Sequence, residues 1–183
     1  RVVTPAGLKS HVDTYARKCI LRAGPFYIND DPFVQNSLYF GHSLGSADSN
    51  WNDPQATGGT ISSVSSFTIA EDDMNWGYIL PFNISKIEIQ CSLRPAGGGT
   101  VTGDDFTIAL YTANRSDASN TVITLTKVAH AQDTFSNGNY TTNDLDHTAN
   151  LNKGTMIFVG VGSEDSTAAK NARGILNITV TER

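Results

Sequence analysis

The chain of 183 residues is poor in charged side chains. Lys, Arg, Asp and Glu make up 17% of it, below the roughly 25% of an ordinary soluble domain. The net charge of −5 gives no basic footprint for nucleic acid. No segment approaches the ~20 consecutive apolar residues that a membrane helix needs. We therefore expect neither a nucleic-acid partner nor a membrane partner.

Cysteine is also scarce, since Cys19 and Cys91 are the only two. Their spacing matches no metal-binding or redox motif. Cys91 occupies an apolar slot between Ile89 and Leu93, which favours a buried strand position over a disulfide bond to Cys19. The disulfide stays open as the alternative.

Spacings typical of catalysis or zinc binding are missing as well. The four histidines, which follow no zinc-ligand spacing, are His11, His42, His130 and His147. The segment 41–45, Gly-His-Ser-Leu-Gly, has the spacing of a nucleophile elbow, but no helical pattern follows it. We therefore expect no cofactor, no metal and no enzymatic activity.

Acidic residues gather in short clusters at 71–73, 104–105, 144–147 and 164–165. None has the spacing or the central glycine of a calcium loop. Asp and Asn side chains stabilise turns by bonding to their own backbone. We interpret each cluster as a solvated turn or loop.

A strict alternation of apolar and polar residues runs through Ile87–Leu93 and returns at Phe106–Leu110 and Leu176–Val180. Successive side chains of a strand point to opposite faces, so this pattern is typical of a sheet with one buried face. Eight candidate strand segments, with turn signals between them, predict an all-β fold, an antiparallel jelly-roll sandwich of about eight strands. They are 37–40, 61–69, 77–80, 84–93, 105–113, 122–131, 155–162 and 174–181. The glycine-rich segment 95–99 is expected to be a flexible crossing between strands.

Residues 1–34 do not follow this pattern. Thr4 and Pro5 are suited to the start of a helix, and apolar residues follow at helical spacing from Leu8 to Cys19. Gly24-Pro25 is expected to end that helix. We predict an N-terminal arm or short helix over 1–34 and a sandwich domain over 35–183. Whether the arm packs on its own domain or docks on a neighbouring subunit stays open.

Aromatic and acidic side chains are the candidates for ligand binding, because flat rings stack on the apolar faces of sugars. Trp51 lies in a long polar loop, where core packing is less automatic, and is the first candidate. The predicted ligand-binding residues are Trp51, Trp76, Tyr140 and Asp144. Tyr78 and Tyr111 are predicted to lie at an oligomer interface.

Three segments carry a resemblance to a known class of proteins: 36–41 (NSLYFG), 76–87 (WGYILPFNISKI) and 151–159 (LNKGTMIFV). Residues 36–183 resemble the jelly-roll domains of tailed-phage virion proteins, such as fibre tips and capsid decoration proteins. The general scheme is similar to the trimeric heads of the C1q and tumour-necrosis-factor type. The resemblance implies a virion location, a homo-oligomer (a trimer) and binding by surface loops, with no catalytic residue.

Two functions are consistent with these observations. The first is a virion structural protein that contacts other copies of itself, contacts other virion proteins through residues 1–34, and presents loops to a host-surface glycan. The alternative is an extracellular carbohydrate-binding module. The abundance of Ser, Thr, Asn and Gly is common to both classes.

Overall fold

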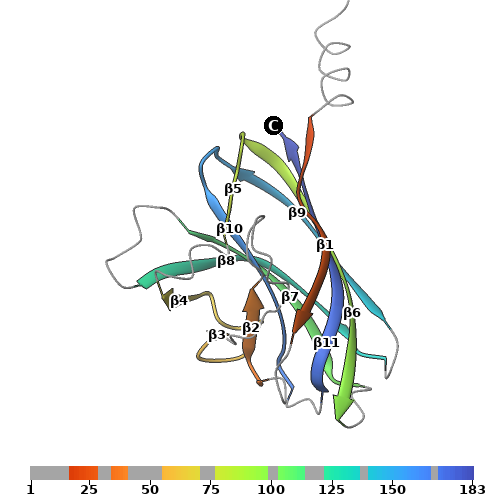
Figure 1. The fold of residues 1–183 in the computed structure, drawn as a ribbon. Coiled ribbons are helices and arrows are strands. Elements are labelled where there is room, and N and C mark those ends of the chain that lie inside the picture. The colour runs from red at the N-terminus through yellow and green to blue at the C-terminus, as the bar shows by residue number, and fades with distance from the viewer. Residues whose placement is uncertain are drawn as a thin grey trace, which may run out of the picture.

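A computed structural model of the chain describes residues 17–28, 34–40, 55–70, 77–98, 103–113, 122–136, 140–165 and 169–183, and its regular elements there are all strands. Figure 1 shows them in two layers. In chain order they are β1 (Lys18–Ile28), β2 (Ser37–Phe40), β3 (Gln55–Ala56), β4 (Ser66–Ala70), β5 (Tyr78–Ile79), β6 (Ile84–Gly98), β7 (Asp105–Ala113), β8 (Val122–Thr134), β9 (Thr141–Leu151), β10 (Met156–Ser163) and β11 (Ala169–Glu182).

The strands form two antiparallel sheets. Sheet A has the order β1-β11-β6-β9, and sheet B has the order β3-β2-β10-β7-β8-β4, with β5 also paired to β10. The strand pairs are nested: β1 pairs with β11, β2 with β10, β6 with β9 and β7 with β8. A long hairpin wound up in this way is a jelly roll. The predicted fold class is therefore confirmed.

The main core lies between the two sheets. Strand β6 buries four side chains in this core, as the alternation in the segment predicts: Ile87, Ile89, Cys91 and Leu93. Both cysteines are free, so the alternative of a disulfide bond is wrong. Burial strongly raises the pKa of the Cys91 thiol, which keeps it protonated and unreactive.

Sheet B curls so far that it encloses a second apolar core on its outer side. Phe40 lies on β2 and Phe67 on β4, which are separated by three strands in the sheet order, yet their ring centroids are 6.3 Å apart. Phe67 also meets the ring of Tyr111 edge-on at 5.1 Å. Every residue of β10 is buried, because both faces of this strand contact apolar side chains. Gly160 belongs to this packing, since a Cβ atom there would lie 2.9 Å from the Phe40 ring.

The N-terminal prediction needs a correction for residues 18–28. These residues are not an arm or a helix but strand β1, an edge strand of sheet A that pairs with β11 (Figure 1). Pro25, expected to end a helix, is accommodated because an edge strand can turn a position without an N–H group away from its neighbour. Residues 1–16 lie outside the described part of the chain, so an arm there stays a prediction.

Two segments expected to be loops are also strands. Pro95 and the glycines up to Gly98 continue β6, which pairs there with β11. The pairing of β6 with β9 stops at Leu93, so Pro95 needs no hydrogen-bond donor on that side. The acidic cluster at 144–147 lies within β9.

A buried polar contact explains why β9 lacked a clear apolar pattern. The Asn143 side chain points inward and its amide donates to the carbonyl oxygens of Phe106 and Ala131, at 2.9 and 3.0 Å. Phe106 and Ala131 belong to sheet B, so this one amide ties the two sheets together. A buried amide whose two N–H groups are both hydrogen-bonded replaces an apolar residue at this position.

Two buried tyrosines give a matched test of hydroxyl pairing. The Val34 N–H donates to the Tyr39 hydroxyl oxygen at 3.1 Å, whereas the Tyr111 hydroxyl has no hydrogen-bond partner in the described part of the chain. We expect Tyr39→Phe to lower the free energy of unfolding by about 1 kcal/mol, and Tyr111→Phe to leave it unchanged or raise it. Urea denaturation of both variants measures the difference, and equal losses would contradict the structure.

Candidate functional site

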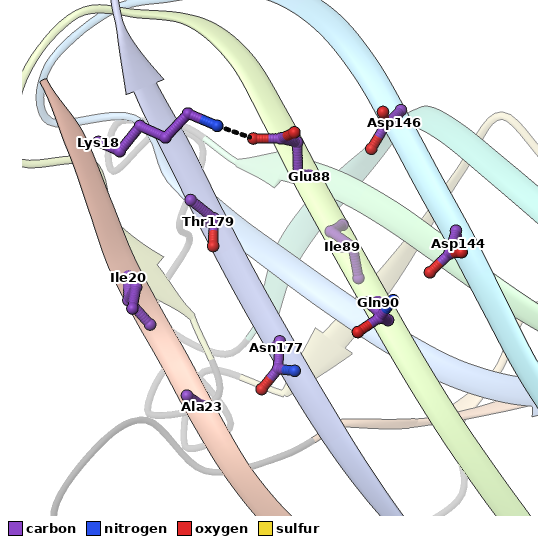
Figure 2. Close-up of a pocket in the computed structure, with 10 residues that line it drawn as sticks. All are labelled: Lys18, Ile20, Ala23, Glu88, Ile89, Gln90, Asp144, Asp146, Asn177 and Thr179. Carbon is purple, nitrogen blue, oxygen red and sulfur yellow. Dashed lines mark hydrogen bonds and ion pairs between the residues drawn. The ribbon is translucent and has the colours of Figure 1, made fainter. Parts of the chain in front are cut away.

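The outer face of sheet A is the broad sheet surface that is open to solvent in the described residues. In sheet B the central strands β10 and β7 are buried on both faces, whereas in sheet A the outward positions of β1, β11, β6 and β9 are exposed or half-buried. Figure 2 shows this face with its side chains projecting from four neighbouring strands. We take it as the candidate site.

A row of polar side chains crosses the middle of this face. The strand register aligns Ala23 of β1, Asn177 of β11, Gln90 of β6 and Asp144 of β9, and Figure 2 shows them lining a shallow depression. The depression has a volume of about 600 Å³. This row offers amide donors and acceptors and one carboxylate, all directed outward.

One end of the face carries a chain of ion pairs. Lys18 Nζ lies 3.0 Å from Glu88, and Lys86 Nζ lies 2.9 Å from both Glu88 and Asp146. Hydrogen bonds from Lys86 and Lys18 lower the pKa of the Glu88 carboxyl, and hydrogen bonds to Asp146 and Glu88 raise the pKa of Lys86. These groups are largely exposed, so the pairs contribute little to stability. They do neutralise one another at the surface.

An apolar stripe runs along the β1 side of the face. Its members are Ile20, Ala23, Pro25 and Tyr27 of β1 and Ile175 of β11. Ile20 is 64% exposed and Ile175 is 48% exposed. We call this set the apolar stripe. Exposed apolar patches of this kind mark contact surfaces.

The other end of the face combines arginine with tyrosine. Arg173 and Arg94 lie directly opposite each other on β11 and β6, and the Arg173 guanidinium lies 5.7 Å from the centre of the Tyr27 ring. Tyr140, which is 56% exposed, shares a depression of about 540 Å³ with Arg173 and Ile175. This end therefore presents positive charge beside aromatic surface.

The structure brings together two of the four predicted ligand-binding residues. Asp144 lies in the polar row and Tyr140 at the arginine end of the same face. Trp51 and Trp76 lie outside the described residues. The ligand roles of all four stay predictions.

The predicted interface positions of Tyr78 and Tyr111 need a correction. Tyr111 is fully buried in the second core, and Tyr78 is buried in the main core of the same chain. Burial raises the pKa of Tyr111 to about 12. It also raises the pKa of Tyr78, although the nearby Arg22 opposes this shift. These side chains pack inside one chain, so they are not available to a neighbouring subunit.

Sequence reasoning missed Gln90, Asn177, Arg94 and Arg173. The alternation in β6 and β11 does indicate that Gln90 and Asn177 point to the wet side of their strands. It does not tell which wet residues become neighbours, because this depends on the register between strands that are far apart in the chain.

The acidic clusters at 104–105 and 164–165 lie side by side, but Asp105 is not in a solvated turn: it is half-buried and begins β7, whereas Glu164 and Asp165 follow β10. The Asp105 carboxylate accepts hydrogen bonds from the backbone N–H groups of Glu164 and Asp165 and from the hydroxyls of Thr107 and Ser163, at 2.7 to 2.9 Å. The Asp105 N–H donates in return to Asp165. Burial alone would raise the pKa of Asp105, but these hydrogen bonds outweigh it and the pKa is lowered. The carboxylate thus connects the end of β10 to the start of β7. We call this set of hydrogen bonds the Asp105 clip.

Neither a metal centre nor a membrane helix is found in the described part of the chain. No group of three or more His, Cys, Asp or Glu side chains is placed to hold a metal ion there. No helix among these residues has the length and hydropathy of a membrane span.

No protein-family model and no curated protein sequence matches this chain. Several solved structures are similar to it at low identity. The globular domain of zebrafish complement 1qA protein is 10% identical, covers 86% of this chain and 94% of its own, and has a TM-score of 0.38. Eiger TNF from S. frugiperda is 8% identical, covers 90% of this chain and 93% of its own, and has a TM-score of 0.41. The CBM22-1 xylan-binding domain of Paenibacillus barcinonensis Xyn10C is 12% identical, covers 92% of this chain and 98% of its own, and has a TM-score of 0.43.

The Asp105 clip makes stability depend on pH. Because its pKa is lower in the folded chain than the ordinary 3.8, the ionised carboxylate stabilises the fold above about pH 4, and this contribution is lost as the pH falls through the folded-state pKa. We expect Asp105→Asn to cost about 2 kcal/mol at neutral pH and progressively less below pH 4. Urea denaturation at several pH values measures this, with Asp104→Asn as the control. A cost that did not change with pH would contradict the clip.

Proposed function

We propose that the chain is a non-enzymatic structural protein that forms a homo-oligomer through the outer face of sheet A. The observation that carries this proposal is the apolar stripe, which exposes Ile20 and Ile175 on a surface of four strands. Complete burial of a large aliphatic side chain is worth about 1.5–3 kcal/mol. Ile20 and Ile175 are 64% and 48% exposed, so covering both contributes binding energy of this order. The polar row beside it supplies hydrogen-bonding groups for such a contact.

The proposed setting of this assembly is a tailed-phage virion, as a capsid decoration protein or a tail-fibre component. Its support is the resemblance carried by residues 36–41, 76–87 and 151–159, which also implies a trimer. Because β1 belongs to the sandwich, the segment left to contact other virion proteins is residues 1–16. Deleting that segment tests this part of the proposal, with incorporation into particles as the measurement.

Charged substitutions on the apolar stripe test the assembly. We expect Ile20→Lys and Ile175→Lys each to weaken self-association about tenfold or more, because each places a charge in an apolar contact. Light scattering over a range of protein concentrations measures the change. Ile79→Lys is the matched control, since Ile79 is 63% exposed but lies on β5, away from this face. A wild-type chain that stays monomeric at high concentration would contradict the proposal.

Carbohydrate binding is the second candidate, and the polar row favours it. Among the described residues, the side chains of Asn177, Gln90 and Asp144 make no hydrogen bond to the protein, and they lie side by side on three strands. Their amide and carboxylate groups match the hydroxyls of a sugar, including a glycan on a host surface. This function and self-association use the same face.

Removing the two amides tests the second candidate. If sugar binds the polar row, the double substitution Gln90→Ala with Asn177→Ala is expected to weaken binding about tenfold or more, because each amide contributes roughly one hydrogen bond of about 1 kcal/mol. A glycan array identifies the sugar and calorimetry measures its affinity. Thr148→Ala, an exposed change on β9 at the ion-paired end, is the control. Silence of the wild-type chain on the array would contradict this candidate.

A further inference from the structure

The outer face of sheet A carries two kinds of charge that find no opposite charge within one chain. Arg94 and Arg173 lie opposite each other, and neither has a carboxylate within salt-bridge distance in the described part of the chain. Like charges directly across two strands repel each other. Asp144 is the complementary case, since it also has no ion-pair partner among these residues.

These groups are too far apart to neutralise one another inside a single copy. Asp144 lies opposite Gln90, and Arg94 is four residues further along β6. At about 3.4 Å per residue this is roughly 14 Å. The other carboxylates on the face, Glu88 and Asp146, are already held by lysines. Figure 2 shows Asp144 beyond this ion-paired group, projecting from β9.

Assembly through this face changes the energetics of the three groups. A charge that is removed from water without a partner is costly, so a covered face needs each charge to be paired. Two adjacent guanidinium groups present several N–H donors to one carboxylate, which is the strong geometry for such a pair. The Tyr27 ring beside Arg173 orients one of these guanidinium groups.

We infer that Asp144 of one copy forms an ion pair with the Arg94–Arg173 pair of a second copy. This inference rests on the proposed self-association and adds the relative placement of the two copies. The arginine end of one face contacts the polar row of the other. The same complementary contact is repeated in a symmetric oligomer, since every copy carries both halves. The partner is therefore the chain itself.

Charge reversal on each side, and then on both sides, tests the contact. One variant carries Asp144→Arg, a second carries Arg94→Asp with Arg173→Asp, and a third combines all three changes. We expect each of the first two to raise the dissociation constant of the oligomer about tenfold or more. The combined variant restores opposite charges at every contact and is expected to recover most of the wild-type affinity. Sedimentation equilibrium measures all three, and circular dichroism checks that each variant is folded.

The outcomes separate this inference from the proposed function. A matched control, Lys153→Glu in the turn after β9, changes a surface charge away from the face and is expected to leave association unchanged. If Ile175→Lys dissociates the oligomer while the arginine variant does not, the ion pair is wrong and the proposed assembly stands. If the combined variant is not rescued, the ion pair is also wrong. If the wild-type chain is monomeric, the proposed assembly fails and the ion pair with it.

Discussion

The antiparallel pairing of β11 with β1 on one side and β6 on the other is the contact that the remaining structure depends on. It brings the first and last described strands of the chain together, and the nested pairs β2–β10, β6–β9 and β7–β8 then follow from winding the intervening chain. It also assembles the outer face of sheet A from segments far apart in sequence. Ala23, Gln90, Asp144 and Asn177 become neighbours only because β1, β11, β6 and β9 hold one register.

The curl of sheet B decides which surface remains for function. Its outer side is occupied by a second core, in which Phe40, Phe67 and Tyr111 pack together although their strands are separated in the sheet order. A strand buried on both faces has a near-continuous apolar sequence, and β10 is buried throughout its length. Sheet A keeps the alternating pattern and therefore keeps a solvent-facing side.

The charges on the outer face of sheet A are arranged unevenly, and this arrangement supports the proposed self-association. At one end the lysines and carboxylates neutralise one another. At the other end Arg94 and Arg173 lie opposite each other, and the described part of the chain places no carboxylate within salt-bridge distance of them. The apolar stripe runs along the length between these ends. A surface with exposed aliphatic groups and separated complementary charges suits a neighbour that has the same surface, which is why self-association is proposed ahead of carbohydrate binding.

The amino-acid pattern was sufficient for the fold class and for the core strands, because period-two alternation in segments such as Ile87–Leu93 reflects side-chain geometry within a single strand. It failed for β1 and β9. Pro25 is acceptable only because β1 became an edge strand, and Asn143 is acceptable only because carbonyls of the other sheet lie within reach of its amide. The candidate site depended still more on the folded chain. The local sequence pattern reveals which side chains face water. Strand register and the curl of sheet B arise from contacts between distant segments, and the register places Asp144 beside Gln90 and Arg94 opposite Arg173.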